Sequence, residues 1–245
     1  MYKEPIFLAG FPILETNQIE LSNYICKRMA SMKKSVLFFA NTNFIVQCRP
    51  ILQRMINDDV LIVNDGIGID LASLLLHRRK FEENLNGTDF TPYFLNKTNA
   101  SLRIFLLGSK PEVLAKATNY LQNQLGQSVV GTCDGYTGIQ RANLVNEINT
   151  LNVDIILVAM GNPKQELWIL DHYQQLNVKL ITGVGALFDF WAGDKSRAPI
   201  FIQRIRMEWF YRLCLEPKRL LKRYTIDVMV FLILCIKHRK SNVKT

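Results

Sequence analysis

The sequence has few residues of the kinds that build metal centres and covalent scaffolds. Its 245 residues include three histidines and five cysteines, and no two cysteines form a C-x-x-C pair. A disulfide scaffold and a zinc ribbon are therefore not favoured, and a reducing, cytoplasmic compartment fits better. The sequence also lacks a D-x-D pair, the usual carboxylate clamp for a metal–nucleotide complex. We therefore expect neither a metal site nor a bound cofactor.

Long apolar runs are absent as well. No stretch of about 18 apolar residues occurs, so the sequence predicts no membrane-spanning helix. The run Ile6–Leu14 contains Pro12 and lacks a basic lead, which indicates a strand and a turn rather than a signal peptide. The run Ile226–Ile236 is interrupted by Asp227 and flanked by basic residues, as in a helix that lies in a membrane interface. A buried carboxyl-terminal helix or an oligomer contact is the alternative.

The charge is distributed unevenly along the chain. Residues 1–194 hold 17 Lys and Arg against 18 Asp and Glu, whereas residues 195–245 hold 13 against 3. The net charge of +9 therefore resides in the last fifth of the sequence. There, arginines alternate with Trp209, Phe210 and Tyr211, which suits the headgroup zone of a membrane. Nucleic acid is the competing partner, and we disfavour it because no nucleic-acid-binding motif is present.

Apolar runs and helical patterns alternate over the first four fifths of the chain. The runs predict strands at Ile6–Ala9, Val36–Ala40, Val60–Val63, Arg103–Leu107, Asp154–Ala159 and Lys179–Thr182. Helices are predicted at about 17–32, 44–57, 68–78, 111–125, 140–151 and 164–176. This rhythm predicts an α/β fold with a Rossmann-like, mostly parallel sheet and helices on both faces. From about residue 198 the strand signals stop, so we predict an α/β core over 1–197 and a basic helical appendage over 198–245, broken at Pro217.

Polar residues gather where the predicted strands end. The segments that follow the strands begin at Asn41-Thr42-Asn43, Asn64-Asp65-Gly66, Gly108-Ser109-Lys110-Pro111, Met160-Gly161-Asn162 and Gly183-Val184-Gly185. In a parallel sheet these segments share one edge, where ligands bind. Gly108-Ser109 precedes a predicted helix start and could cradle a phosphate, or it could be an ordinary turn. Asn41-Thr42-Asn43 could equally cap the next helix.

Asp65 is the strongest catalytic candidate. It follows an apolar strand directly, and glycines at 66 and 68 would let a ligand approach closely. A carboxylate in such a place can act as a general base, and the alternative is a cap for the following helix. A dinucleotide fingerprint fails at its third glycine, and neither a Walker A sequence nor a G-x-S-x-G elbow is present.

In these motifs the sequence resembles the bacterial WecG/TagA/CpsF glycosyltransferases, family 26 in the sugar-transferase classification. The resemblance runs from about Phe11 to Tyr224. It is carried most strongly by Met160-Gly161-Asn162-Pro163-Lys164-Gln165-Glu166-Leu167-Trp168, Gly183-Val184-Gly185-Ala186, Phe188-Asp189-Phe190, Arg197-Ala198-Pro199, Glu208-Trp209, Tyr211-Arg212 and Glu216-Pro217. One departure is Asn84, because the family usually has arginine shortly before the Gly87-Thr88-Asp89 element.

The resemblance implies an inverting glycosyltransferase that acts at the inner face of the plasma membrane. It would move a sugar from a UDP-sugar to an undecaprenyl-diphosphate-linked saccharide for a cell-surface polysaccharide, without a metal. Asp65 would be the catalytic base in the core. The implied substrate-binding residues are Thr42, Asn43, Gly108, Ser109, Asn162, Lys164, Gln165, Glu166 and Arg197. The appendage would face the membrane and the lipid diphosphate through Arg204, Arg212, Arg219 and Arg223.

Two other functions stay open at this point. A membrane-peripheral protein that binds a nucleotide or a lipid without catalysis would share the basic tail but would have no need of a base at Asp65. A nicotinamide-dependent oxidoreductase would have the same fold, but it would need the dinucleotide-binding glycine pattern, which this sequence lacks. The sequence leaves open which sugar is moved, which polymer is served, and whether the chain forms a homo-oligomer.

Overall fold

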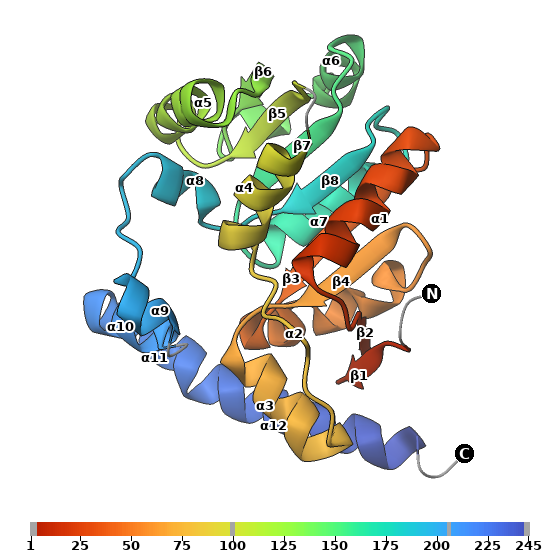
Figure 1. The fold of residues 1–245 in the computed structure, drawn as a ribbon, viewed down its shortest axis with the longest axis vertical. Helices are drawn as coiled ribbons and strands as arrows, with labels where there is room; N and C mark the ends of the chain where they lie inside the picture. Colours follow the sequence, from red (N-terminus) through yellow and green to blue (C-terminus); the bar gives the residue numbers. More distant parts are fainter. Residues whose placement is uncertain (1–3, 99–100, 205–206, 243–245) are drawn as a thin grey trace.

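Six parallel strands form the central sheet. The computed structural model describes residues 4–98, 101–204 and 207–242, and it describes only the backbone at Arg204, Arg219 and residues 239–242. The strands lie in the order β4-β3-β8-β7-β5-β6 (Figure 1). Their bounds are β3 (Ser35–Ala40), β4 (Val60–Asn64), β5 (Arg103–Gly108), β6 (Ser128–Cys133), β7 (Ile155–Ala159) and β8 (Leu180–Gly183). The predicted α/β class and parallel sheet are confirmed.

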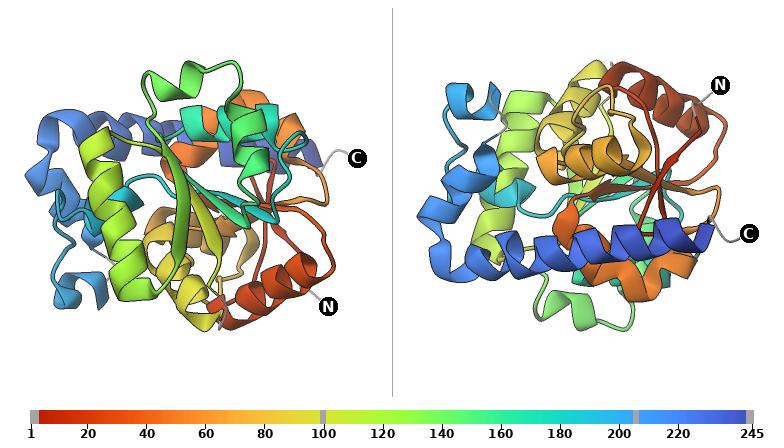
Figure 2. Two further views of the ribbon diagram at one scale, coloured as in Figure 1. Left: turned by 90° about the horizontal axis from the view of Figure 1, so that it is seen from above. Right: turned by 90° about the horizontal axis from the view of Figure 1, so that it is seen from below.

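Helices cover both faces of this sheet (Figure 2). They are α1 (Gln18–Ala30), α2 (Thr42–Cys48), α3 (Ile67–His77), α4 (Gly87–Lys97), α5 (Pro111–Leu125), α6 (Leu144–Thr150), α7 (Lys164–His172) and α8 (Leu187–Trp191). Successive residues of β3 enter opposite apolar clusters: Val36 and Phe38 belong to one, and Leu37 and Phe39 to the other. A strand buried on both faces needs apolar residues at every position, which explains the continuous runs in the sequence.

Several elements differ from the predictions. The strand expected at Ile6–Ala9 exists as β1 (Ile6–Leu8), but it pairs antiparallel with β2 (Phe11–Ile13) outside the main sheet. The helix expected over 44–57 ends at Cys48 and continues as the 3₁₀ segment η1 (Arg49–Met55), where Pro50 cannot donate a backbone hydrogen bond. Strand β6 and helices α4 and α8 were not predicted. Strand β6 is a half-exposed edge strand without a continuous apolar run.

The carboxyl-terminal helices lie along one side and the lower edge of the core (Figure 1). They are α9 (Ile200–Arg204), α10 (Glu208–Leu215), α11 (Pro217–Tyr224) and α12 (Ile226–Asn242), so the predicted break at Pro217 is confirmed. Helix α12 contacts α2 and α3, and its Phe231 and Cys235 belong to a core cluster. None of the helices in the described part of the chain is long and apolar enough to cross a membrane. The division into two domains at residue 197 stays a prediction.

Candidate active site

The segments after β3, β4, β5, β7 and β8 line one cavity at the carboxyl edge of the sheet. Its volume is about 730 Å³. The predicted site residues in its wall are Asn43, Asp65, Ser109, Asn162, Lys164, Gln165, Arg212 and Arg223. Since parallel strands end at the same edge, residues spread over more than a hundred positions in the sequence meet in one place.

Asp65 lies immediately after β4, at the turn into α3. Its backbone N–H donates to the Ala40 carbonyl at 2.8 Å, and its Oδ2 accepts from Asn41 Nδ2 at 3.1 Å. Gly66 makes the turn with φ of 89°, which favours glycine, and its N–H donates to Asn84 Oδ1 at 2.5 Å. Gly66 is the N-cap of α3, and no side chain caps that helix. The alternative reading of Asp65 as a helix cap is therefore wrong, and its carboxylate is directed elsewhere.

Asn41 does two jobs beside this carboxylate. Its Oδ1 accepts from the Phe44 N–H at 3.0 Å and so caps α2, as one reading of the sequence predicted. Its Nδ2 points to Asp65 at the same time. Because the cap fixes the amide plane, Asn41 holds the Asp65 carboxylate in one orientation.

Burial raises the pKa of Asp65 above the usual carboxyl range. The hydrogen bond from Asn41 and the positive charges of Arg212 and Arg223 oppose this rise, while Glu208 adds to it. A carboxylate whose pKa is raised is a stronger base in its ionised form.

Asp65 also lines a second cavity, of about 450 Å³. Thr42 lies in its wall, together with apolar residues from α3 and the carboxyl-terminal helices, such as Leu71, Trp209 and Val228. Five residues line both cavities: Asn41, Asp65, Thr88, Arg212 and Arg223. Asp65 therefore stands where two differently lined cavities meet.

The loops after β7 and β8 are joined by a buried network. Gln165 Oε1 accepts from the backbone N–H groups of Gly161 and Gly185, each at 3.2 Å. Glu166 Oε1 accepts from Asn162 Nδ2 at 2.6 Å and from Gln165 Nε2 at 2.8 Å. Asn162 in turn lies 3.4 Å from Asn43 Nδ2, so the network reaches the loop after β3.

Glu166 is the buried acceptor of this network. Its side chain is 1% exposed and does not line either cavity, although the sequence suggested a place in the wall. Its Oε2 is buried without a conventional hydrogen bond among the described residues, and the Cys48 thiol lies beside this carboxyl group. Burial raises the pKa of Glu166 to about 7, and burial together with Glu166 raises the pKa of Cys48.

Gly108 and Ser109, which were predicted to bind substrate, lie at the end of β5 and in the turn that follows it. Gly108 has φ of 110°, and a Cβ there would lie 2.4 Å from the Ala159 carbonyl oxygen, so only glycine fits. The next residue, Ser109, lines the larger cavity, but its N–H is already bonded to Ala159 O at 3.0 Å. A phosphate cradle at this turn would have to use other donors.

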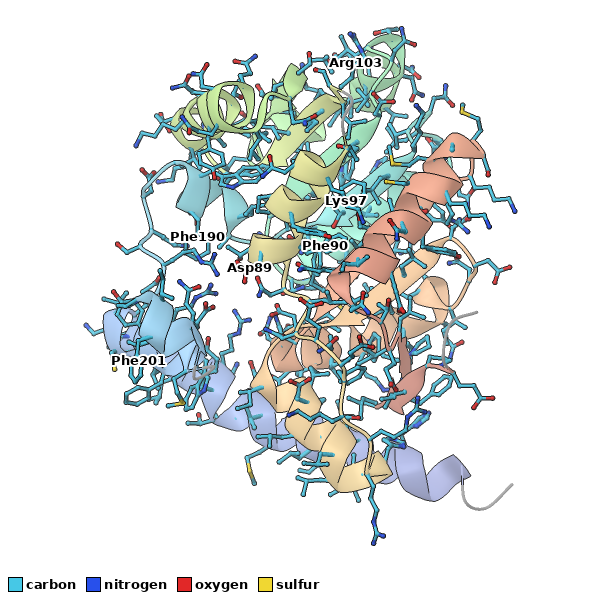
Figure 3. The ribbon with its side chains drawn as sticks, viewed as in Figure 1. Asp89, Phe90, Lys97, Arg103, Phe190 and Phe201 are labelled. Atoms are coloured by element: carbon cyan, nitrogen blue, oxygen red, sulfur yellow. The ribbon has the colours of Figure 1, made fainter. Side chains whose placement is uncertain are left out.

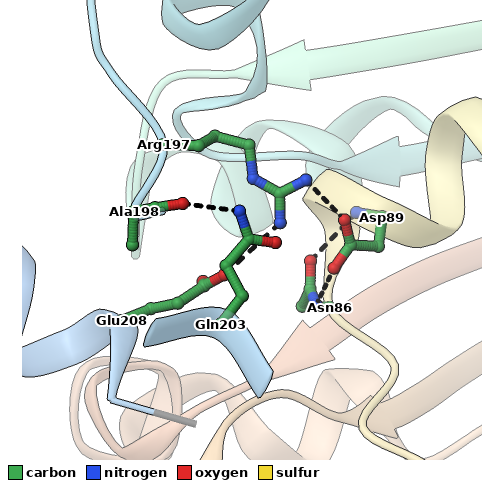
Figure 4. A network of polar contacts seen from close by, with 6 residues as sticks. All are labelled: Asn86, Asp89, Arg197, Ala198, Gln203 and Glu208. Atoms are coloured by element: carbon green, nitrogen blue, oxygen red, sulfur yellow. Dashed lines mark hydrogen bonds and ion pairs between the residues drawn. The ribbon is translucent and has the colours of Figure 1, made fainter. Parts of the chain in front are cut away.

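Arg197 lies outside both cavity walls and connects the core to the tail. Its Nη1 donates to Asp89 Oδ1 at 2.6 Å and its Nη2 to Glu208 Oε1 at 3.4 Å (Figure 4). Burial alone would raise the pKa of Asp89, but hydrogen bonds from Arg197 and Asn86 and the arginine charge hold that pKa below its usual value. Arg197 thus ties α4 to α10.

The appendage contributes two arginines to the site. The Arg212 guanidinium lies 5.1 Å from the centre of the Phe190 ring, and Arg223 lies over Tyr224. Asp89 and Phe190 both lie on the side of the core that faces α9 and α10 (Figure 3). The side chains of Arg204 and Arg219, the other two predicted lipid-diphosphate ligands, lie outside the described residues.

Some cavity residues escaped the sequence analysis. Tyr136 lines the larger cavity from the loop after β6, a strand that was not predicted. Lys195 lines it too, paired with Asp189 at 2.6 Å, and its place at the end of the core was the only available signal. Among the described side chains, no group of three or more His, Cys, Asp or Glu is arranged to hold a metal ion.

Comparison with known proteins agrees with the geometry. Residues 6–245 match the model of the family described as glycosyl transferase WecG/TagA/CpsF. The N-acetylglucosaminyldiphosphoundecaprenol N-acetyl-beta-D-mannosaminyltransferases of Staphylococcus aureus strains MRSA252 and NCTC 8325 are each 31% identical over 224 residues. These alignments cover 84% of this chain and 87% of each relative.

Proposed function

The chain belongs to the WecG/TagA/CpsF family of glycosyltransferases, and we propose that it transfers a sugar, with inversion, from a UDP-sugar to an undecaprenyl-diphosphate-linked saccharide during synthesis of a cell-surface polysaccharide. The observation that carries this proposal is the position of Asp65 at the junction of a polar cavity and a partly apolar one. A reaction between a water-soluble donor and a lipid-linked acceptor needs such a junction, with a base within reach of both.

The larger cavity suits the UDP-sugar. Its wall is built from amides, hydroxyls and backbone groups of the strand-end loops, which can recognise a sugar and a nucleoside. Lys195, Arg212 and Arg223 also line it and supply positive charge for a diphosphate. Asn43, Asn162 and Gln165 are held by the buried network, so we assign them to sugar contacts and assign Glu166 to positioning them.

The smaller cavity suits the acceptor. Thr42 and the amides of Asn84 and Asn86 can meet a saccharide close to Asp65, and Leu71 and Trp209 offer apolar contact farther out. Arg212 and Arg223 lie in this wall as well and would face the lipid diphosphate. We place the reaction at the inner face of the plasma membrane, where such an acceptor presents its headgroup.

Asp65 would remove the proton from the acceptor hydroxyl as that oxygen attacks the anomeric carbon. The new glycosidic bond forms on the face opposite UDP while the bond from the anomeric carbon to the diphosphate oxygen breaks. The electron pair leaves with UDP, and the cationic side chains of the larger cavity stabilise the departing charge. The hydrogen bond from Asn41 keeps the basic oxygen aimed during this step.

The names of the relatives indicate which sugar to test first. Their names specify N-acetylmannosaminyl transfer to an N-acetylglucosaminyl-diphospho-undecaprenol, so these substrates should be tested first. Asn84 occupies the place where the family usually has arginine, and it holds the Gly66 N–H beside Asp65. If the protein prefers a different donor or acceptor from its relatives, we expect Asn84 to be a residue that causes the difference.

A donor screen tests the proposal. The full chain is mixed with a short-chain prenyl-diphosphate-linked N-acetylglucosamine and, in turn, UDP-N-acetylmannosamine, UDP-N-acetylglucosamine, UDP-glucose and UDP-galactose. We expect acceptor-dependent release of UDP with one donor and a product heavier by one sugar residue. Binding of UDP-sugars and prenyl diphosphate with no release of UDP would instead support a binding protein without catalysis.

A further inference from the structure

Helix α12 carries apolar side chains on two opposite faces. One face, with Phe231 and Cys235, is buried against the core. The other is solvent-exposed and includes Ile226, Met229 and Ile233, of which Met229 is 62% exposed. These three follow the helical spacing of three to four residues, so they form one stripe. The prediction of a buried carboxyl-terminal helix therefore holds for one face of α12, and the other face is exposed.

Helix α3 of the core carries a second exposed apolar stripe. Leu71, Leu74 and Leu75 are 50%, 48% and 71% exposed, at the i, i+3 and i+4 positions of a single face. Arg78 continues this face one turn later and is exposed at the end of the helix. Three exposed leucines on one short helix form a continuous apolar patch rather than the scattered exposure that is normal for a surface.

The two stripes belong to the same side of the molecule. Helices α3 and α12 contact each other, and both lie along the lower edge in Figure 1 and face the viewer's side in the right panel of Figure 2. None of the exposed side chains described in α3, α11 and α12 is acidic, whereas Lys218, Lys222 and Lys237 are exposed and basic. An apolar surface whose own helices expose basic and no acidic described side chains is complementary to an anionic lipid bilayer.

This surface is continuous with the smaller cavity. Leu71 of α3 and Val228 of α12 line that cavity, and Leu71 is also half-exposed on the outer face. We propose that α3 and α12 together form the bilayer-docking surface, with the leucines of the core helix α3 inserted among the lipids. The inference rests on the proposed function in one respect: docking here brings the mouth of the cavity to the lipid, so that a prenyl-linked sugar reaches Asp65 without its tail leaving the bilayer.

The proposal makes the core itself, and not only the basic tail, responsible for membrane binding. The test is flotation of the full chain with vesicles of phosphatidylcholine containing phosphatidylglycerol. Leu74→Ser/Leu75→Ser changes two exposed residues that line neither cavity. We expect the vesicle partition coefficient to fall roughly tenfold or more, because two leucine contacts with the apolar phase are lost. The matched control is Ile19→Ser/Met32→Ser, with Ile19 in α1 and Met32 just after it. These two residues are about as exposed as Leu74 and Leu75, and the control should bind like the parent.

A second variant separates the apolar and the charged contributions. Arg78→Gln should weaken binding to the anionic vesicles by roughly fivefold and leave binding to pure phosphatidylcholine vesicles unchanged. Lys33→Gln, just after the end of α1, is its control. Weaker binding of both variants to the anionic vesicles, with unchanged circular dichroism, supports the docking surface.

Unchanged flotation of Leu74→Ser/Leu75→Ser would overturn the proposal. So would a parent chain that is dimeric without lipid and becomes monomeric in this variant while vesicle binding persists, because the face would then meet a second copy. Vesicle binding needs no turnover. A protein that binds vesicles through α3 but releases no UDP would therefore refute the proposed function alone, and an active protein that binds without α3 would refute only this inference.

Discussion

The two cavities that meet at Asp65 are built in different ways. The larger one is walled mainly by core loops, and the hydrogen bonds that Gln165 accepts from Gly161 and Gly185 join the segments after β7 and β8. The smaller one is walled by the start of α3 and by α10 to α12, with Trp209 and Leu71 among its residues. The difference suggests a donor site that is preformed and an acceptor site that exists only when the tail is docked on the core.

Asp65→Asn should have the largest effect, because this residue serves both cavities. The amide keeps the shape and can still contact Asn41, but it cannot accept the hydroxyl proton. We expect turnover to fall by a factor of about 10² to 10⁴, the usual contribution of a general base. The measurement is UDP release with the lipid-linked acceptor.

The control for Asp65→Asn is binding of UDP by calorimetry, together with thermal unfolding. Both should be close to those of the parent, since the variant leaves the larger cavity otherwise intact. Near-normal turnover in the purified variant would remove Asp65 from the role of base.

Glu166→Gln tests whether the Glu166 carboxyl group is protonated, and therefore neutral, in the folded protein. Burial raises the pKa of Glu166 from 4.5 to about 7, so the folded protein keeps a proton that the unfolded chain loses. The parent therefore loses stability as the pH rises from about 4.5 to 7, by roughly 3 kcal/mol in total. Glutamine is neutral throughout and can still accept from Asn162 and Gln165.

Urea unfolding at several pH values measures this effect. The free energy of unfolding of Glu166→Gln, relative to the parent, should rise between pH 5 and pH 8 and stay constant above that range. A difference that does not change with pH would mean that Glu166 is charged in the folded protein and would argue against a preformed neutral network.

A crossed pair of variants tests the assignment of the two cavities. Trp209→Ala removes an apolar wall of the smaller cavity, and Lys195→Ala removes a positive charge from the larger one. We expect Trp209→Ala to raise the KM for the acceptor about tenfold, and Lys195→Ala to raise the KM for the donor about tenfold, each with little change in the other KM. If each variant raised the KM of the other substrate instead, the assignment of donor and acceptor to the two cavities would be reversed. If both variants raised both KM values, the cavities would not hold separate substrates.

The sequence was sufficient to predict this edge of the core and insufficient for the contacts across it. Apolar runs such as Val36–Ala40 indicated the strands, and the rule for parallel sheets predicted that Asn43, Asp65 and Asn162 lie close together. The direction of a side chain within a helix was harder to predict. Gln165 and Glu166 are neighbours in sequence and both are buried, but consecutive helical residues point about 100° apart, so Gln165 lines the larger cavity and Glu166 does not.

Contacts between the core and the tail were the least predictable. Arg197 was expected to bind substrate, and the structure pairs it with Asp89 and Glu208, more than a hundred residues apart from each other. Nothing local in the sequence encodes such a pairing. For the same reason, the sequence did not predict that the exposed leucines of α3 lie beside α12, because α3 and α12 are far apart in the chain.

The smallest predicted effect concerns the positive charge of Arg212, a residue of the carboxyl-terminal helices, and its influence on Asp65 in the core. Arg212 lines both cavities, and its positive charge holds down a pKa that burial raises at Asp65. Arg212→Gln removes this charge, so the pKa of Asp65 should rise further and the acid limb of the pH–rate profile should move to higher pH. Arg212→Lys keeps the charge and should leave that limb close to the parent's, even where the loss of stacking on Phe190 lowers the rate. Because Arg223 contributes a second charge, the displacement will be partial. An acid limb that stays in place in Arg212→Gln would show that the tail completes the acceptor cavity without tuning the base, and the two cavities would then share Asp65 only by position.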